Sequence, residues 1–339
     1  MKRYLLIATI FVFIAVMVCA CTPDPSLHPG QNGNQTEAPE PAPPPRNAVR
    51  LTMDTGAVSG TYYPYGGTLA LAIHAATGYI KINVNPSGGS VENIQQIAGG
   101  LADLAIAQND MMEYAYNGSD IWNEEPVKNM ATLMSLYPEV CQLIVAGDSG
   151  IMSIDGMKGK RISIGAAGSA IEANALQILA AYGLTKDDLL VQNLGFDDAA
   201  AAMKDNEIDG FFVTSGLPNT AVLNLSTSLD IRMIAMADNK INYLLENHSF
   251  YSKTTITERD YNFITEPINT VAVQATLIAR ADLDEQMAYD IVKAIIESKE
   301  GIMVANAKGV FIDPKFAVQA ISVGLHPGAK RYLKEIDVL

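Results

Sequence analysis

One arrangement of strand, glycine-containing turn and helix occurs twice in this sequence, and it constrains the fold more than any other feature. The first copy joins a strand-like run at 49–53, the turn GAVSGTYYPYGG at 56–67 and a helix-like run at 68–76. The second copy lies at 161–181 and matches the first in layout rather than in residue identity. Strands alternate with helices beyond each copy, which is typical of a parallel or mixed α/β sheet. The repetition predicts an α/β protein with two lobes of similar build.

The turn of the first copy predicts a site for a small ligand. Its glycines let the backbone approach a ligand closely, and the helix that follows offers unpaired N–H groups. Thr61, Tyr62 and Tyr63 add hydroxyl groups at this helix start. The turn contains neither GxxxxGK[ST] nor GxGxxG, so it matches no known phosphate-binding loop.

Other strand ends and helix starts carry polar residues that we expect at the same edge of each lobe. Open α/β sheets bind ligands beyond the carboxyl ends of their strands, and two such edges that face each other form a cleft. Ser90 and Ser169 are predicted helix N-caps. The candidate ligand-binding residues are Thr61, Tyr62, Tyr63, Ser87, Ser90, Gln108, Tyr137, Gly168, Ser169, Glu172, Thr214, Ser215 and Gly216.

Length and charge limit the possible classes of protein. The chain has 339 residues, of which 49% are hydrophobic, enough for two domains with cores of their own. A formal net charge of −14 leaves no basic face for nucleic acid.

The order of strands and helices also predicts the bounds of the two lobes. We predict lobe I at 49–143 plus 268–339 and lobe II at 144–267. Two strands, at 129–137 and 141–146, are expected on either side of Pro138-Glu139.

The N-terminus has the features of a bacterial lipoprotein signal peptide, predicted at 1–20. Two basic residues precede an apolar run that is short for a membrane span. The sequence VCAC at 18–21 resembles a lipobox, so Cys21 is the expected lipidation site; plain secretion without lipid is the alternative. Residues 21–48 are rich in proline and are predicted to form an extended tether. We therefore expect an extracytoplasmic protein anchored to a bacterial membrane by lipid.

Motifs for catalysis or metal binding are absent from the sequence. The four histidines have no metal-ligand spacing, and there is no GxSxG nucleophile elbow. Ser169 and Ser215 are nucleophiles by residue type only, because no histidine is placed to activate them. We predict no enzymatic activity and no metal; an extracytoplasmic hydrolase that uses one of these serines is the alternative.

Several short motifs give the chain a resemblance to the TAXI family, the solute receptors of one class of TRAP transporter. The resemblance covers about residues 49–336 and departs from the family at Ala170 and Ile171, where Gly and Thr are common. The motifs are GTYYPYG at 60–66, SGGSVEN at 87–93, AQND at 107–110, YPE at 137–139 and FFVTSGLP at 211–218.

The resemblance implies a type II periplasmic-binding fold, in which two α/β lobes close on a ligand without a cofactor or catalysis. It implies glutamate or a related small carboxylate as the ligand and a TRAP membrane permease, driven by an ion gradient, as the partner. A receptor of an ABC importer and a ligand-sensing module are the alternatives. The motifs contain no arginine, so we expect helix starts and hydroxyl groups to hold the carboxylate. An amino group, if the ligand has one, would need an acceptor such as Glu139, Glu172 or a backbone carbonyl.

Overall fold

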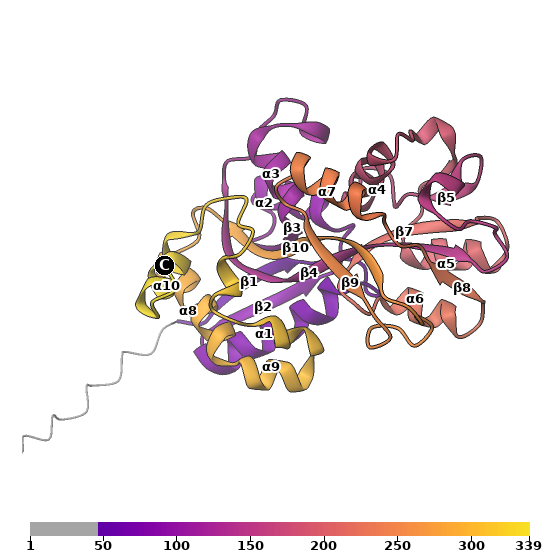
Figure 1. Cartoon of the computed structure of the whole chain (residues 1–339). Coiled ribbons are helices and arrows are strands. Elements are labelled where there is room, and N and C mark those ends of the chain that lie inside the picture. Colours follow the sequence, from indigo (N-terminus) through magenta and orange to yellow (C-terminus); the bar gives the residue numbers. More distant parts are fainter. Residues whose placement is uncertain (1–46) are drawn as a thin grey trace, which may run out of the picture. The chain divides into compact units, whose positions relative to one another are not determined.

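Strands and helices alternate along residues 47–339, the part of the chain that the computed structural model describes (Figure 1). The predicted signal peptide, Cys21 and nearly all of the tether lie outside these residues. The strands are β1 (Val49–Asp54), β2 (Ile80–Asn85), β3 (Leu104–Gln108), β4 (Met130–Ala146), β5 (Arg161–Ser163), β6 (Leu190–Gln192), β7 (Gly210–Ser215), β8 (Ile231–Met233), β9 (Ser252–Ile256) and β10 (Ile268–Arg280). The helices are α1 (Tyr62–Thr77), α2 (Ser90–Ala98), α3 (Asn109–Asn117), α4 (Ala170–Ala181), α5 (Phe196–Lys204), α6 (Thr220–Ser226), α7 (Asp238–Asn247), α8 (Glu285–Glu297), α9 (Lys299–Ala305) and α10 (Pro327–Glu335).

The strands of residues 47–339 form one mixed sheet with the order β2-β1-β3-β10-β4-β7-β5-β6, while β8 pairs with β4 and β9 with β10. At one end β1 runs parallel to β2 and β3, and at the other β5 runs parallel to β6 and β7. Between the ends, β10 and β4 pair antiparallel from Ala272↔Val140 to Arg280↔Met130. These two long strands cross from one lobe to the other, as Figure 1 shows. The predicted α/β class is confirmed.

Each end of the sheet has a hydrophobic core of its own. At the β1 end, α1, α8 and α10 bury Leu69, Ile291 and Leu333 against the sheet. At the β5 end, α4 and α7 bury Ile178 and Leu244. Separate cores let each half keep its packing if the halves move relative to each other. No helix in 47–339 combines the length and the apolar character that crossing a bilayer requires.

Strand β4 differs from the sequence prediction. The two strands expected on either side of Pro138-Glu139 are one continuous strand of 17 residues. Proline has no N–H to donate to a neighbouring strand. It is therefore tolerated where no neighbouring strand needs that hydrogen bond, or close to an irregularity in strand pairing. Pro138 lies outside the stretch of β4 that pairs with β7, which begins at Val140. It also lies close to a register shift in the pairing with β10, which falls between the partners of Tyr137 and Ser135.

Helix α1 also begins earlier than predicted, at Tyr62 rather than at residue 68. Pro64 then lies in the first turn, where the missing N–H has no helical acceptor in any case. The earlier start brings Thr61 and Tyr62 to the helix mouth together.

Candidate ligand-binding site

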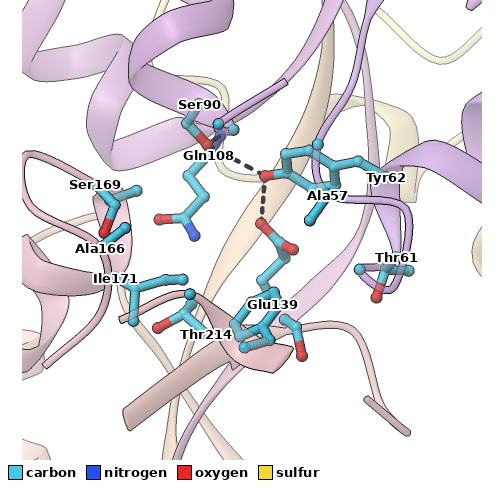
Figure 2. Close-up of a pocket in the computed structure, with 18 of the residues that line it drawn as sticks. Ala57, Thr61, Tyr62, Ser90, Gln108, Glu139, Ala166, Ser169, Ile171 and Thr214 are labelled. Atoms are coloured by element: carbon cyan, nitrogen blue, oxygen red, sulfur yellow. Dashed lines mark hydrogen bonds between the residues drawn. The ribbon is translucent and has the colours of Figure 1, made fainter. Parts of the chain in front are cut away.

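A cavity of about 190 Å³ lies between the two lobes, beyond the carboxyl ends of β1, β3 and β7. Figure 2 shows that its side chains come from both halves of the chain. The lining residues are Gly56, Ala57, Gly60, Thr61, Tyr62, Ser87, Gly88, Gly89, Ser90, Gln108, Glu139, Ala166, Ser169, Ala170, Ile171, Gly195, Phe196, Thr214 and Ser215.

Four helices begin at this cavity. The N-cap residues of α1, α2, α4 and α5 are Thr61, Gly89, Ser169 and Gly195, and all four line it. The first N–H groups of a helix have no acceptor within the helix, and its start carries about half a unit of positive charge. The convergence of these helix starts favours an anionic group in the cavity.

The loop before α2 is fixed by Asn93. Its Nδ2 donates to the carbonyl oxygens of Thr55 at 2.5 Å and of Ile106 at 2.7 Å. Its Oδ1 accepts from Ser87 Oγ at 2.6 Å. Gly89 has φ +99°, a conformation that side chains with a Cβ rarely adopt. These bonds tie the loop to β1 and β3 and hold the start of α2 beside the cavity.

Glu139, on β4, supplies an acidic group to the cavity wall. It is 2% exposed, and the Tyr62 hydroxyl donates to its Oε2 at 2.5 Å while lying 3.3 Å from Ser90 Oγ (Figure 2). Burial raises the pKa of Glu139 to about 8, although the hydrogen bond from Tyr62 and the amide of Gln108 lower it. The carboxyl therefore gains or loses a proton close to neutral pH.

Lys308 lies behind this part of the wall. Its ammonium donates to the carbonyl oxygen of Leu217 and lies 5.6 Å from the ring centroid of Tyr137. Burial lowers the pKa of Lys308 to about 8, against the attraction of Glu139. Lys308 is not among the lining residues, so it acts on Glu139 only through space.

Gln108 ends β3, and its side chain extends into the cavity between Ser169 and Glu139 (Figure 2). Its Oε1 is buried and has no hydrogen-bond partner among residues 47–339. Its backbone N–H donates to Ser90 Oγ at 3.0 Å. The prediction that Ser90 caps α2 is therefore wrong: Gly89 is the N-cap, and the Ser90 hydroxyl ties α2 to the end of β3.

Most of the predicted site residues meet in the cavity wall, although they come from separate parts of the chain. Those in the wall are Thr61, Tyr62, Ser87, Ser90, Gln108, Ser169, Thr214 and Ser215. Those outside it are Tyr63, Tyr137, Gly168, Glu172 and Gly216.

The tyrosines and glycine outside the wall have packing reasons for their positions. Tyr63 follows Tyr62 on a helix that turns about 100° per residue, so the two face different directions. Tyr137 packs edge-on against Tyr65, with ring centroids 5.4 Å apart, and its hydroxyl has no partner in the described part of the chain. A Cβ at Gly216 would lie 2.9 Å from the Tyr137 ring. Tyr137 and Gly216 therefore support the wall from behind.

Glu172 and Gly168 are occupied by their own loop. One oxygen of the Glu172 carboxylate accepts from the Gly168 N–H at 2.6 Å and the other from Asn193 Nδ2 at 3.0 Å. The Glu172 N–H donates to Ser169 Oγ at 3.2 Å, which confirms Ser169 as the N-cap of α4. The carboxylate of Glu172 therefore holds the turn that precedes α4.

Sequence reasoning left Glu139 out of the candidate residues and considered it only as an acceptor for an amino group. The available signal was the YPE motif, which contains Glu139. Pairing of β4 with β10 along its length buries this residue. Sequence reasoning also left out Phe196, which lines the cavity at the start of α5. The signal was Gly195 directly before this helix, because a glycine before a helix start also marks the other turns of the site. Ala57 and Ile171 add apolar surface that no polar motif indicates.

The side chains of the cavity wall are suited to hydrogen bonding with a ligand. The residues that line the cavity include no lysine, arginine or histidine. Ser215 Oγ donates to the Gly216 carbonyl at 3.3 Å, and Ser169 Oγ is used as a cap. Arg161 donates to Asp209 Oδ1 at 2.6 Å, at the opposite end of β5 from the cavity. Neither serine hydroxyl is hydrogen-bonded to a carboxylate or a histidine among residues 47–339.

Two side-chain hydrogen bonds join elements of the two lobes. Ser59 Oγ, before α1, donates to Asp197 Oδ2 on α5 at 2.5 Å. Asn174 Nδ2 of α4 donates to Asp110 Oδ2 of α3 at 2.6 Å. These bonds hold the elements that flank the cavity in contact with each other.

Comparisons with known proteins agree with this architecture. Residues 53–336 match the model of the NMT1-like family. The alkanesulfonate-binding protein SsuA of Xanthomonas axonopodis pv. citri, bound to MOPS, is similar in structure with a TM-score of 0.51 and 15% identity over 86% of this chain and 85% of that chain. A Listeria monocytogenes protein assigned to an L-cystine ABC transporter has a TM-score of 0.50 and 13% identity over 76% of this chain and 94% of that chain. The predicted type II periplasmic-binding fold with two lobes is confirmed.

Proposed function

The chain belongs to the NMT1-like family, and from this premise we propose that it is an extracytoplasmic solute-binding receptor that delivers a small ligand to a membrane transporter. The observation that carries the proposal is the convergence of four helix starts and several hydroxyl groups from two lobes on one cavity. Such a site binds an anion reversibly and leaves it chemically unchanged, as a receptor requires.

The finer assignment is a TAXI-type receptor of a TRAP transporter. The ligand is a small carboxylate, such as glutamate or a related amino or organic acid, and the partner is a TRAP permease. The motifs at the glycine turns and strand ends support this assignment. Cys21 carries the lipid anchor, and residues 21–48 tether the receptor to the membrane. One acyl chain anchors only marginally, so stable attachment needs the two or three chains of a bacterial lipoprotein.

Ligand capture proceeds by closure of lobe I (49–143 plus 268–339) on lobe II (144–267). The strands β4 and β10 cross between the lobes and supply the hinge. Contacts such as Ser59 with Asp197 join the lobes at the rim of the cavity. A ligand that contacts both lobes stabilises the closed form and shifts the population toward it.

A receptor of an ABC importer is the second candidate. The similar structures are named for alkanesulfonate binding and for an L-cystine ABC transporter. A sulfonate is also an anion that helix starts would bind. Neighbouring genes distinguish the candidates: a large multi-span permease favours TRAP, an ATPase favours ABC, and a signalling receptor favours a sensor.

The experiment that tests the proposed function is mass spectrometry of small molecules released from the purified protein, followed by titration calorimetry. We expect a small carboxylate that rebinds with micromolar affinity. Ser169→Ala should weaken binding about fivefold, because Ser169 lines the cavity and a lost hydrogen bond costs about 1 kcal/mol. Ser226→Ala, outside the cavity wall, is the control. Retention of a sulfonate would favour the ABC candidate, and binding of neither class would refute receptor function.

A further inference from the structure

Lys308 is a buried lysine whose ammonium bonds to a carbonyl oxygen instead of a carboxylate. It lies on the 3₁₀ helix Ala307–Phe311, next to α9, and is 8% exposed. Its ammonium donates to the carbonyl oxygen of Leu217 and lies 5.6 Å from the ring centroid of Tyr137. No carboxylate among residues 47–339 accepts a hydrogen bond from it. Burying a charged group costs free energy unless an opposite charge offsets the loss of water, so the site has room for the effect of an anion.

The ammonium lies directly behind the cavity wall. A Cβ at Gly216 would lie 2.7 Å from Lys308 Cε and 3.1 Å from its Nζ, so the side chain passes against the backbone of this glycine. Ser215, the preceding residue, lines the cavity. Consecutive Cα atoms are about 3.8 Å apart, which places the ammonium within about 10 Å of the wall. At this distance inside a protein, a unit charge changes the affinity for an anion about tenfold.

The charge of this region at neutral pH is set by Lys308 together with Glu139. Burial lowers the pKa of Lys308 to about 8 and raises the pKa of Glu139 to about 8. At pH 7 the ammonium is therefore mostly charged and the carboxyl mostly protonated. The other titratable groups that face the two are Tyr137 on β4, Asp260 before β10, Tyr62 on α1 and Asp110 on α3. Lys308 is the one member of this set that carries a positive charge, so its removal would make the cavity less favourable for an anion.

We propose that Lys308 is a specificity-determining residue, whose ammonium supplies, from behind the wall, the positive charge that makes the cavity prefer an anion to a neutral molecule of the same shape. This inference rests on the proposed receptor function and assigns part of the selection to a residue that the bound molecule does not touch. A lysine that only bonded to the Leu217 carbonyl would support the binding of anions and neutral molecules alike. The ratio of the two affinities therefore separates the two roles.

A pH dependence follows from this arrangement. Lys308 and Glu139 both lose protons as the pH rises through about 8. Whichever proton leaves first, the net charge of the two groups falls from positive to negative. An anion in the cavity favours the protonated forms, so its affinity should fall about tenfold or more between pH 7 and pH 9. The affinity for a neutral amide should change little over the same range.

The test measures affinities by titration calorimetry for glutamate, succinate, pyruvate and any carboxylate released from the purified protein. Each is paired with the analogue in which one carboxylate is a primary amide, which keeps the shape and removes one negative charge. We expect at least one carboxylate to bind wild type more tightly than its amide at pH 7. Lys308→Met should reduce that ratio about tenfold by weakening the carboxylate alone. Lys334→Met, which removes an exposed charge on α10, is the matched control and should keep the ratio.

Each other outcome decides against the inference. If amides bind wild type as tightly as their carboxylates, or if Lys308→Met weakens both equally, the role in selection is wrong while receptor function stands. If none of these compounds binds wild type, both proposals are wrong. If Lys308→Met does not fold, the wild-type pH profile decides, because a carboxylate affinity that stays constant between pH 7 and pH 9 would overturn the inference.

Discussion

Replacing Asp110 with asparagine should flatten the pH dependence of stability and make the protein more stable above pH 7. Asp110 lies in the first turn of α3 and is fully buried. Its Oδ1 accepts from the Met111 N–H at 2.8 Å, and its Oδ2 accepts from Asn174 Nδ2 on α4 at 2.6 Å. Burial raises the pKa of Asp110 to about 7, although both hydrogen bonds lower it.

The magnitude follows from proton linkage. The ordinary pKa of the group is 3.8, so the folded protein binds a proton at Asp110 more tightly than the unfolded chain does. The stability that this proton provides is fully present below about pH 4 and is lost as the pH rises through about 7. Between pH 5 and pH 8 the loss in free energy of unfolding is about 2 to 3 kcal/mol. Asparagine is neutral throughout, so D110N should avoid this loss.

Urea unfolding of wild type and D110N at four pH values between 5 and 8 measures the difference directly. Asn174 Oδ1 is buried without a partner among the described residues, so its amide can rotate to accept from the new asparagine. Glu139, with its own raised pKa, is present in both proteins. Glu207→Gln, which removes an exposed carboxylate, is the control and should keep the wild-type slope. Parallel curves for wild type and D110N would refute the reasoning, because Asp110 would then be ionised in both states.

Further outcomes are expected for the anchor, the lobes and the cavity wall. Cys21→Ser should leave the protein unlipidated and largely unprocessed by mass spectrometry; identical processing and absence of lipid in both forms would contradict the lipobox. Small-angle scattering should give a smaller radius of gyration with saturating ligand, and an unchanged radius would count against closure. Tyr62→Phe should weaken binding about 2- to 10-fold in calorimetry, because it removes the hydrogen bond to Glu139. Tyr137→Phe should leave binding unchanged, since its hydroxyl has no partner in 47–339, and equal losses in the two variants would contradict this distinction.

The cavity-lining residues that the sequence predicts can be found from local sequence pattern alone. Thr61, Ser87 and Ser169 each lie in a glycine-containing turn after a strand, and Gln108 and Ser215 end strands themselves. Parallel strands end at the same edge of a sheet, so the local pattern of strand and helix is enough to bring these residues together. No knowledge of side-chain packing was required for this part of the site.

Glu139 and Tyr137 depend on contacts that local pattern does not contain. Pro138 interrupts the apolar run, and the sequence therefore predicts two strands with a connection between them. Pairing with β10 makes one strand instead and buries both residues. Packing against Tyr65 then places Tyr137 in the core of lobe I, while Glu139 reaches the cavity. Long-range register decides which of these neighbours faces a ligand.

The wall has no basic side chain because the backbone can supply the positive potential. Each of the four helix starts contributes about half a unit of charge, which together can offset a carboxylate. Peptide dipoles are held in place by the helices, so they lose no side-chain entropy when an anion binds. An arginine at the same place would pair with Glu139, the acidic residue of the wall. Truncating one cap, such as Ser169, leaves the N–H groups of the other helices in place, so anion binding should weaken without being abolished. Glu139 and Gln108 lie on strands, so their side chains can be changed without altering a helix start.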